Sequence, residues 1–179
     1  MSAAATEQAV TSPGDGREAL HAALAAVPDP EIPVLTLADL GVLRSIEEID
    51  GRVVVTITPT YSGCPAMAQM AAELRAVLER AGVEGEVRTV LSPAWSTDWM
   101  SAEGRAKLEA FGIAPPPVAP ADGPVPVSLG PRRADAQPTC PQCHSARTDM
   151  VSEFGSTACK ALYRCLDCLE PFDYFKGLQ

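Results

Sequence analysis

The sequence is poor in the features that nucleic-acid binding, export or membrane insertion require. Its 14 Lys and Arg against 23 Asp and Glu give a net charge of −9, so no basic surface is available to neutralise phosphates. The longest apolar stretches fall far short of the ~20 residues of a membrane span. The first residues show neither the basic start nor the apolar core of a secretory signal. We therefore expect a cytoplasmic protein that binds neither nucleic acid nor membranes.

Familiar catalytic motifs are missing as well. The sequence has no Ser-His-Asp set, phosphate loop, nicotinamide fingerprint or EF-hand pattern, and it lacks the pair of Glu-x-x-His helices that a di-iron site needs. It has two histidines, and His21 has no partner spaced for catalysis. We therefore do not expect the chain to be catalytic on its own.

Cysteine, by contrast, is present six times, and four of the six form two C-x2-C pairs, Cys140 with Cys143 and Cys165 with Cys168. Two such pairs about twenty residues apart are typical of a tetrahedral Zn²⁺ site. Four protein thiolates leave no coordination position open, so the site is expected to be structural. A terminal domain of about forty residues needs such a site to keep its fold.

The first pair and His144 also match C-x-x-C-H, the attachment pattern of c-type haem. Haem attachment requires export, for which no signal is visible, and it leaves the second pair unexplained. We interpret His144 as an exposed neighbour of the turn, with a role as a substitute ligand as the alternative.

Hydrophobic periodicity predicts a small α/β sandwich before the zinc site. A first helix is expected to begin at a capping box of Asp15 and Glu18 and to stop at Pro28. Two strands joined by Asp50-Gly51 predict a hairpin. The expected strands lie at 42–49, 52–58 and 86–91, and the further helices at 65–81 and 101–111. Strand, helix and strand imply a right-handed parallel crossover, hence a mixed sheet with helices on one face.

The predicted domain organisation has four parts, because eight of the 17 prolines fall in residues 113–139 without an apolar period. These parts are a disordered tail (1–14), the α/β domain (15–113), a proline-rich linker (114–138) and the zinc ribbon (139–179).

Cys64 is the candidate for a reactive or metal-binding thiol. Pro65 follows it, and proline favours the first helical position, so Cys64 is expected at or just before a helix start. Backbone N–H groups and the helix dipole there stabilise a thiolate. A small buried cysteine that fills a strand-to-helix corner is the equal alternative. Because four thiolates commonly hold an iron–sulfur cluster, Cys64 would have to share one with another chain, with other ligands or with a recipient protein.

Other candidates have structural alternatives. Cys159 lies six residues before Cys165, about 20 Å along a strand, so we expect it to be a packed thiol beyond reach of the zinc. Trp95 and Trp99 indicate a partner surface or a cover for the end of the sheet. Three acidic residues offer oxygen ligands near the same end, although turn chemistry explains them equally: Asp29, Glu31 and Asp39.

Two sets of motifs resemble known families. Asp29-Pro-Glu-Ile-Pro33, Leu37-Ala-Asp-Leu-Gly41 and Gly63-Cys64-Pro65 together resemble the small α/β domain family associated with iron–sulfur cluster assembly, over residues 17–113. The runs at 154–165 and 170–176 resemble the PaaD family of accessory proteins of the phenylacetyl-CoA epoxidase, a bacterial multicomponent monooxygenase of aerobic phenylacetate degradation.

The resemblance implies an accessory subunit that assembles or maintains an iron or iron–sulfur centre, with Cys64 carrying the metal transiently. It implies the other epoxidase subunits or their reductase as partners, and a homo-oligomer is compatible with a shared site. A docking role is the alternative, with contact surfaces at Trp95, Trp99 or the aromatic tail: Phe172, Tyr174 and Phe175. A thiol-dependent enzyme using Cys64 ranks last, because no base is identifiable.

Overall fold

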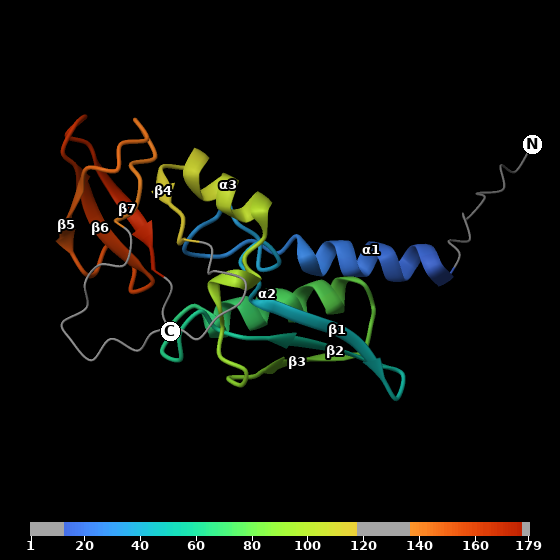
Figure 1. The fold of residues 1–179 in the computed structure, drawn as a ribbon. Coiled ribbons are helices and arrows are strands. Elements are labelled where there is room, and N and C mark those ends of the chain that lie inside the picture. The colour runs from blue at the N-terminus through green and yellow to red at the C-terminus, as the bar shows by residue number, and fades with distance from the viewer. Residues whose placement is uncertain (1–12, 118–136, 177–179) are drawn as a thin grey trace, which may run out of the picture.

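The computed structural model describes residues 13–117 and 137–176. Three α-helices and one short 3-10 helix (η1) accompany seven strands in two sheets (Figure 1). In chain order the elements are α1 (Pro13–Ala25), β1 (Leu43–Ile49), β2 (Arg52–Ile57), α2 (Met67–Arg80), β3 (Gly85–Thr89), η1 (Thr97–Trp99), α3 (Ala102–Ala110), β4 (Ile113–Ala114), β5 (Thr148–Ser152), β6 (Lys160–Cys165) and β7 (Pro171–Phe175).

The first sheet has the order β1-β2-β3 and confirms the predicted mixed α/β fold. β1 and β2 are antiparallel, and their turn places Asp50 at φ 51° and Gly51 at φ 77°, the left-handed values that a two-residue hairpin needs. β2 and β3 are parallel, and α2 connects them. Helix α2 packs against this sheet and α1 lies alongside α2 (Figure 1).

The starts of two helices differ from the sequence prediction. α1 begins at Pro13, so Asp15 lies inside the helix rather than at its cap, because proline is well suited to a first helical turn. α2 begins at Met67, two residues after Pro65, and Pro65 lies in a turn that precedes the helix. Most of the predicted tail, residues 1–12, lies outside the described residues.

The second sheet has the order β4-β7-β6-β5 and contains the zinc ribbon. β5, β6 and β7 form an antiparallel meander, as short strands joined by turns do. β4 directly follows α3 and pairs in parallel with β7, at Ile113 with Asp173. Ile113 and Ala114, directly after α3, therefore already belong to the ribbon sheet. The linker predicted at 114–138 stays a prediction, because residues 118–136 lie outside the described part.

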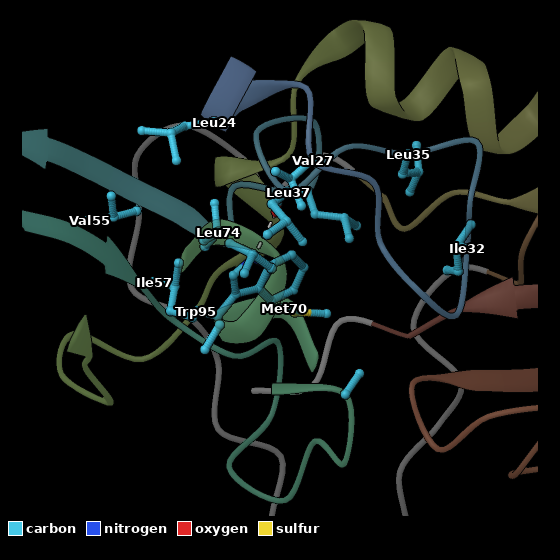
Figure 2. Close-up of a cluster of buried hydrophobic side chains, with 14 of the residues drawn as sticks. Leu24, Val27, Ile32, Leu35, Leu37, Val55, Ile57, Met70, Leu74 and Trp95 are labelled. Atoms are coloured by element: carbon cyan, nitrogen blue, oxygen red, sulfur yellow. Dashed lines mark hydrogen bonds between the residues drawn. The ribbon is translucent and has the colours of Figure 1, made fainter. Parts of the chain in front are cut away.

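A shared hydrophobic core joins the ribbon to the α/β sandwich. Its main part comes from α1, α2, β2 and the loop between α1 and β1, as Figure 2 shows for Leu24, Leu37, Ile57, Met70 and Leu74. Two ribbon side chains, Cys159 and Phe175, are buried in the same cluster. Burial of this seam places the start of β6 and the end of β7 against the sandwich, beside the loop that carries Ile32.

Trp95 fixes the seam between the two parts. Its ring meets Phe175 edge-on, with ring centroids 6.1 Å apart, and its indole Nε1 donates a hydrogen bond of 2.9 Å to the Leu40 carbonyl. A buried indole N–H needs such a partner, and here the sandwich loop supplies it. The ribbon's last strand and the loop before β1 are thus held by one side chain.

Candidate metal centre and thiol pocket

The four cysteines of the two C-x2-C pairs meet at one end of the ribbon. Cys140 and Cys143 lie in the turn before β5, Cys165 ends β6, and Cys168 lies in the turn before β7. Their sulfur atoms all lie within 4.8 Å of one another. The sulfur of Cys140 is 3.7 Å from that of Cys168, and Cys143 is 3.5 Å from Cys165.

These distances fit a tetrahedral zinc ion. Zn–S bonds of about 2.3 Å place the four sulfurs of a tetrahedron about 3.8 Å apart. Backbone N–H groups of Cys168 and Asp167 also lower the pKa of Cys165 to about 6, against the opposing effect of burial. A thiolate with a low pKa is predisposed to bind metal. The four cysteines would therefore hold Zn²⁺ as a structural ion, without an open coordination position.

His144 does not join this cluster. Its side chain is exposed, and its Nδ1 lies 3.4 Å from a carboxylate oxygen of Glu109 on α3. Its backbone N–H donates to the Cys140 carbonyl, and its φ of 58° shows that it turns the chain. The geometry supports the interpretation as a neighbour of the turn. The four-cysteine cluster accounts for both C-x2-C pairs, whereas haem attachment to the first pair leaves the second pair unexplained.

Cys64 lies in the turn that leads from β2 to α2. Its side chain is half-buried, and the backbone N–H groups of Ala66 and Met67 act to lower the pKa of its thiol. Burial is nevertheless the largest effect and raises the pKa of Cys64, and the nearby carboxylates of Glu31 and Asp29 raise it further. The expected stabilisation of a thiolate is therefore present but outweighed.

Cys64 faces a narrow pocket whose wall combines the sandwich and the ribbon. Asp29 and Glu31, in the loop after α1, and Cys159, at the start of β6, line this pocket together with Cys64. The thiol of Cys159 lies 3.9 Å from Glu31 Oε2. We call these four residues the thiol pocket. The structure thus brings two of the three acidic candidates and a second thiol to Cys64.

Each of the two buried pocket groups beside Cys64 has a clear local reason for its position. The carboxylate of Asp29 accepts hydrogen bonds from the backbone N–H groups of Glu31 (2.8 Å) and Ile32 (2.7 Å), as an Asx turn does, while burial raises its pKa. Burial also raises the pKa of Cys159, and its sulfur lies 3.0 Å from the Thr157 hydroxyl. The Asx turn thus fixes Asp29 in a position where its carboxyl group still lines the pocket.

Asp39, the third acidic candidate, has a structural role instead. Its carboxylate accepts hydrogen bonds from Thr36 N–H (3.0 Å) and Lys107 Nζ (2.9 Å), and its backbone carbonyl accepts one from Ser101. A Cβ on Gly104 would lie 2.8 Å from the Asp39 carbonyl, so α3 packs directly on this loop. Asp39 therefore joins α3 to the sandwich. The interpretation of Asp39 as a candidate metal ligand is corrected.

The predicted partner surface is also corrected in part. Trp95 is only 5% exposed, because Phe175 and the Leu40 carbonyl cover it. Phe172 and Phe175 of the aromatic tail are buried too. Trp99 is half-buried, and the guanidinium carbon of Arg44 lies 3.5 Å from its ring centroid. The sequence pattern could not reveal this burial, because the covering groups come from distant parts of the chain.

Cys159 is the pocket residue that sequence reasoning undervalued. It was expected to be a packed thiol, and it is buried, but its thiol faces Glu31 rather than hydrocarbon alone. No spacing rule connects it to Cys64. The one available signal was the length of extended chain between Cys159 and Cys165, which places Cys159 too far away to bind the same zinc ion. The four-cysteine cluster indeed excludes Cys159.

The ligand atoms of the ribbon cysteines are gathered closely, and those of the thiol pocket are not. Within residues 13–117 and 137–176, the ribbon cysteines form the one set of three or more His, Cys, Asp or Glu ligand atoms that lie within 4.8 Å of one another. The thiol pocket is thus not drawn together to metal-binding distances.

In the same described ranges, no helix has both the length and the apolar character to cross a membrane.

The fold and the sites define a class of protein: an iron–sulfur-assembly α/β domain combined with a zinc ribbon. The model of the family described as "Iron-sulfur cluster assembly protein" matches residues 17–92. The model described as "PaaD zinc beta ribbon domain" matches residues 124–176.

Individual relatives extend this assignment. The chain is 45% identical over 158 residues, 88% of its own length and 90% of the relative's, to a protein from Escherichia coli that is named as one of the subunits of a "Putative 1,2-phenylacetyl-CoA epoxidase". The chain belongs to the PaaD family.

Other similarities cover the sandwich. A "Fe-S protein maturation auxiliary factor" from Porphyromonas gingivalis is 38% identical over 88 residues, 48% of this chain and 83% of that protein. The crystal structure of a DUF59 domain from Bacillus anthracis is 31% identical, with a TM-score of 0.47, and the match covers 52% of this chain and 91% of that domain.

Proposed function

We propose that the chain is an accessory subunit of a phenylacetyl-CoA epoxidase that assembles or maintains an iron or iron–sulfur centre of the complex. Membership of the PaaD family supports the epoxidase as the system served, since the Escherichia coli relative is named as one of its subunits. The match of the sandwich to the iron–sulfur cluster assembly family supports maturation as the task. Its substrate is then the metal centre itself, which is handed to the oxygenase component or to the reductase.

The observation that carries the proposal is the position of Cys64. Its thiol is half-buried at a pocket, beside the carboxyl groups of Asp29 and Glu31, whereas the four ribbon sulfurs are gathered into a closed set. Metal binding displaces the proton of a thiol, and the raised pKa of Cys64 keeps it protonated until a cation arrives. Such a sulfur, which regains its proton easily, releases metal more readily than a fourfold thiolate cage does.

The direct test replaces Cys64 by Ser in cells that produce the epoxidase. We expect the Cys64→Ser protein to keep its zinc and its fold, while the iron content of the purified epoxidase falls by about tenfold or more, as for the loss of a metal-handling group. Ser62→Ala, in the same turn and exposed, is the matched control and should leave iron loading unchanged. An epoxidase with full iron content in the presence of Cys64→Ser would contradict the proposal.

A docking role is the second candidate function, and one observation favours it. The ribbon exposes large apolar side chains along its edge strand β5 and the following loop: Met150 (49% exposed), Val151 (60%) and Phe154 (64%). An unpaired edge strand with exposed apolar residues is suited to contact another protein. Met150→Ser with Val151→Ser should then abolish co-purification with the epoxidase, whereas Cys64→Ser should not.

A further inference from the structure

Cys159 has no part in the zinc site, although it belongs to the ribbon. Cys159 lies in the turn directly before β6, and Cys165 of the four-cysteine site ends this strand. A strand of this length separates its ends by about 20 Å, since each residue advances the chain by about 3.3 Å. β6 therefore carries one thiol to the zinc and presents another to the sandwich.

The position of Cys159 is fixed by both parts of the molecule. Its backbone carbonyl accepts a hydrogen bond of 2.8 Å from the N–H of Lys176, just after β7. Phe175, the residue before, packs against Trp95 of the sandwich. These contacts bring the thiol of Cys159 to the Glu31 carboxylate (3.9 Å) and into the wall of the pocket that Cys64 also lines.

We propose that Cys159 is the second thiol of the transfer site, so that the ribbon and the sandwich each supply one sulfur to a single bound Fe²⁺. This inference rests on the proposed function and adds a ligand to it. Two thiolates with the Glu31 carboxylate form a mixed sulfur and oxygen donor set, which a divalent first-row metal such as Fe²⁺ can bind. The set leaves a coordination position for the acceptor, unlike the four-sulfur site.

The binding step balances without any change of oxidation state. Each thiol loses its proton to solvent as its sulfur bonds to iron, so one Fe²⁺ replaces two protons. Because the ligand atoms of Cys64, Cys159 and Glu31 do not all lie within 4.8 Å of one another before binding, side chains must rotate into place. The pocket is therefore a site that closes on its cargo, which is consistent with release by the reverse rotation.

The inference also gives the ribbon a reason to be folded against the sandwich. The sandwich contributes a single cysteine to the described pocket, and the second comes from the turn before β6, a strand that also ends at the four-cysteine site. Without the ribbon, Fe²⁺ would have one thiolate and carboxylates alone. The zinc would then act on the transfer site at a distance, by placing Cys159.

The test is an anaerobic titration of the zinc-loaded full chain with Fe²⁺ alone, in wild type, Cys159→Ser and Cys64→Ser. We expect one Fe²⁺ per wild-type chain with two protons released, and one proton released with an affinity lower by about 100-fold or more in either variant. Met67→Leu removes a sulfur that is not a thiol from the same pocket wall and should leave the affinity within about twofold.

A second measurement does not depend on any variant. Dibromobimane, which bridges two nearby thiols, should join Cys64 to Cys159 in the zinc-loaded wild type, and Fe²⁺ should prevent the reaction. If Cys159→Ser binds Fe²⁺ like wild type, or if the bridge never forms, Cys159 is not a ligand. Should Cys159→Ser also support full epoxidase maturation while Cys64→Ser does not, the inference fails and the proposed function stands.

Discussion

The two ends of β6 carry the same chemical group in two different settings. At one end Cys165 joins three other cysteines, and the four sulfurs lie within 4.8 Å of one another. At the other end Cys159 faces Glu31 and shares a pocket with Cys64, but no such close set forms among these described residues. A complete ligand set favours a permanent ion, and an incomplete set favours exchange. The contrast distinguishes Cys159 from Cys165 better than burial does, because both are buried.

The largest expected effect comes from removing one cysteine of the four-cysteine site, at the Cys165 end of β6. Structural zinc supplies about 10–16 kcal/mol of apparent binding free energy in small zinc domains. Cys140→Ser should therefore unfold the ribbon, with loss of zinc and of hydrogen-exchange protection along β6. Because Cys159 directly precedes β6, its thiol should become freely alkylated. Full protection of β6 in a zinc-free variant would show that the two ends do not depend on one ion.

A smaller effect is expected at the seam that joins the ends. Phe175 is 1% exposed and packs on Trp95, so Phe175→Ala should lower the free energy of unfolding by about 3–5 kcal/mol, the usual cost of emptying a buried aromatic site. Urea unfolding followed by tryptophan fluorescence measures it.

Phe154→Ala provides the matched comparison for the seam. Phe154 is 64% exposed, and its ring lies 4.4 Å from Lys176 Nζ, so the cost should stay below about 1 kcal/mol. Equal losses for the two variants would mean that ribbon and sandwich are not energetically joined through Phe175.

The smallest effect concerns the reactivity of the Cys64 thiol. Burial raises the pKa of Cys64, so less thiolate is present at neutral pH than in an ordinary thiol. Iodoacetamide should modify Cys64 of the zinc-loaded Cys159→Ser protein a few-fold more slowly than glutathione at about pH 7.5. The rate should rise with pH through a midpoint above that of glutathione. Faster reaction than glutathione would show that the N–H groups of Ala66 and Met67 outweigh burial.

Local features of the chain were predictable because local physics decides them. The Asp50-Gly51 turn needs left-handed backbone conformations, and both residues adopt them. The spacing within each C-x2-C pair fits one tight turn, and the alternation in β2 matches the burial of Val55 and Ile57. The errors, such as the start of α1 at Pro13, are shifts of a few residues at element ends.

The pocket was not predictable in the same way. Trp95 could have served a partner or the core, and only Phe175 and the Leu40 carbonyl decide that it is buried. Cys64 was recognised from its helix start, but the net direction of its pKa depends on burial and on the carboxylates of Glu31 and Asp29. Desolvation and charge at a site come from all the elements around it, which short-range patterns do not encode.

The amino-acid order alone thus determined the two C-x2-C turns, the hairpin and the presence of one isolated thiol before α2, since each depends on residues a few positions apart. It also determined the parallel crossover, since strand, helix and strand follow one another along the chain. The tertiary structure decided that Cys159 meets the pocket of Cys64 and that β4 joins the ribbon sheet. Those outcomes depend on how two hydrophobic surfaces pack, and burial of apolar area has no direction along the sequence.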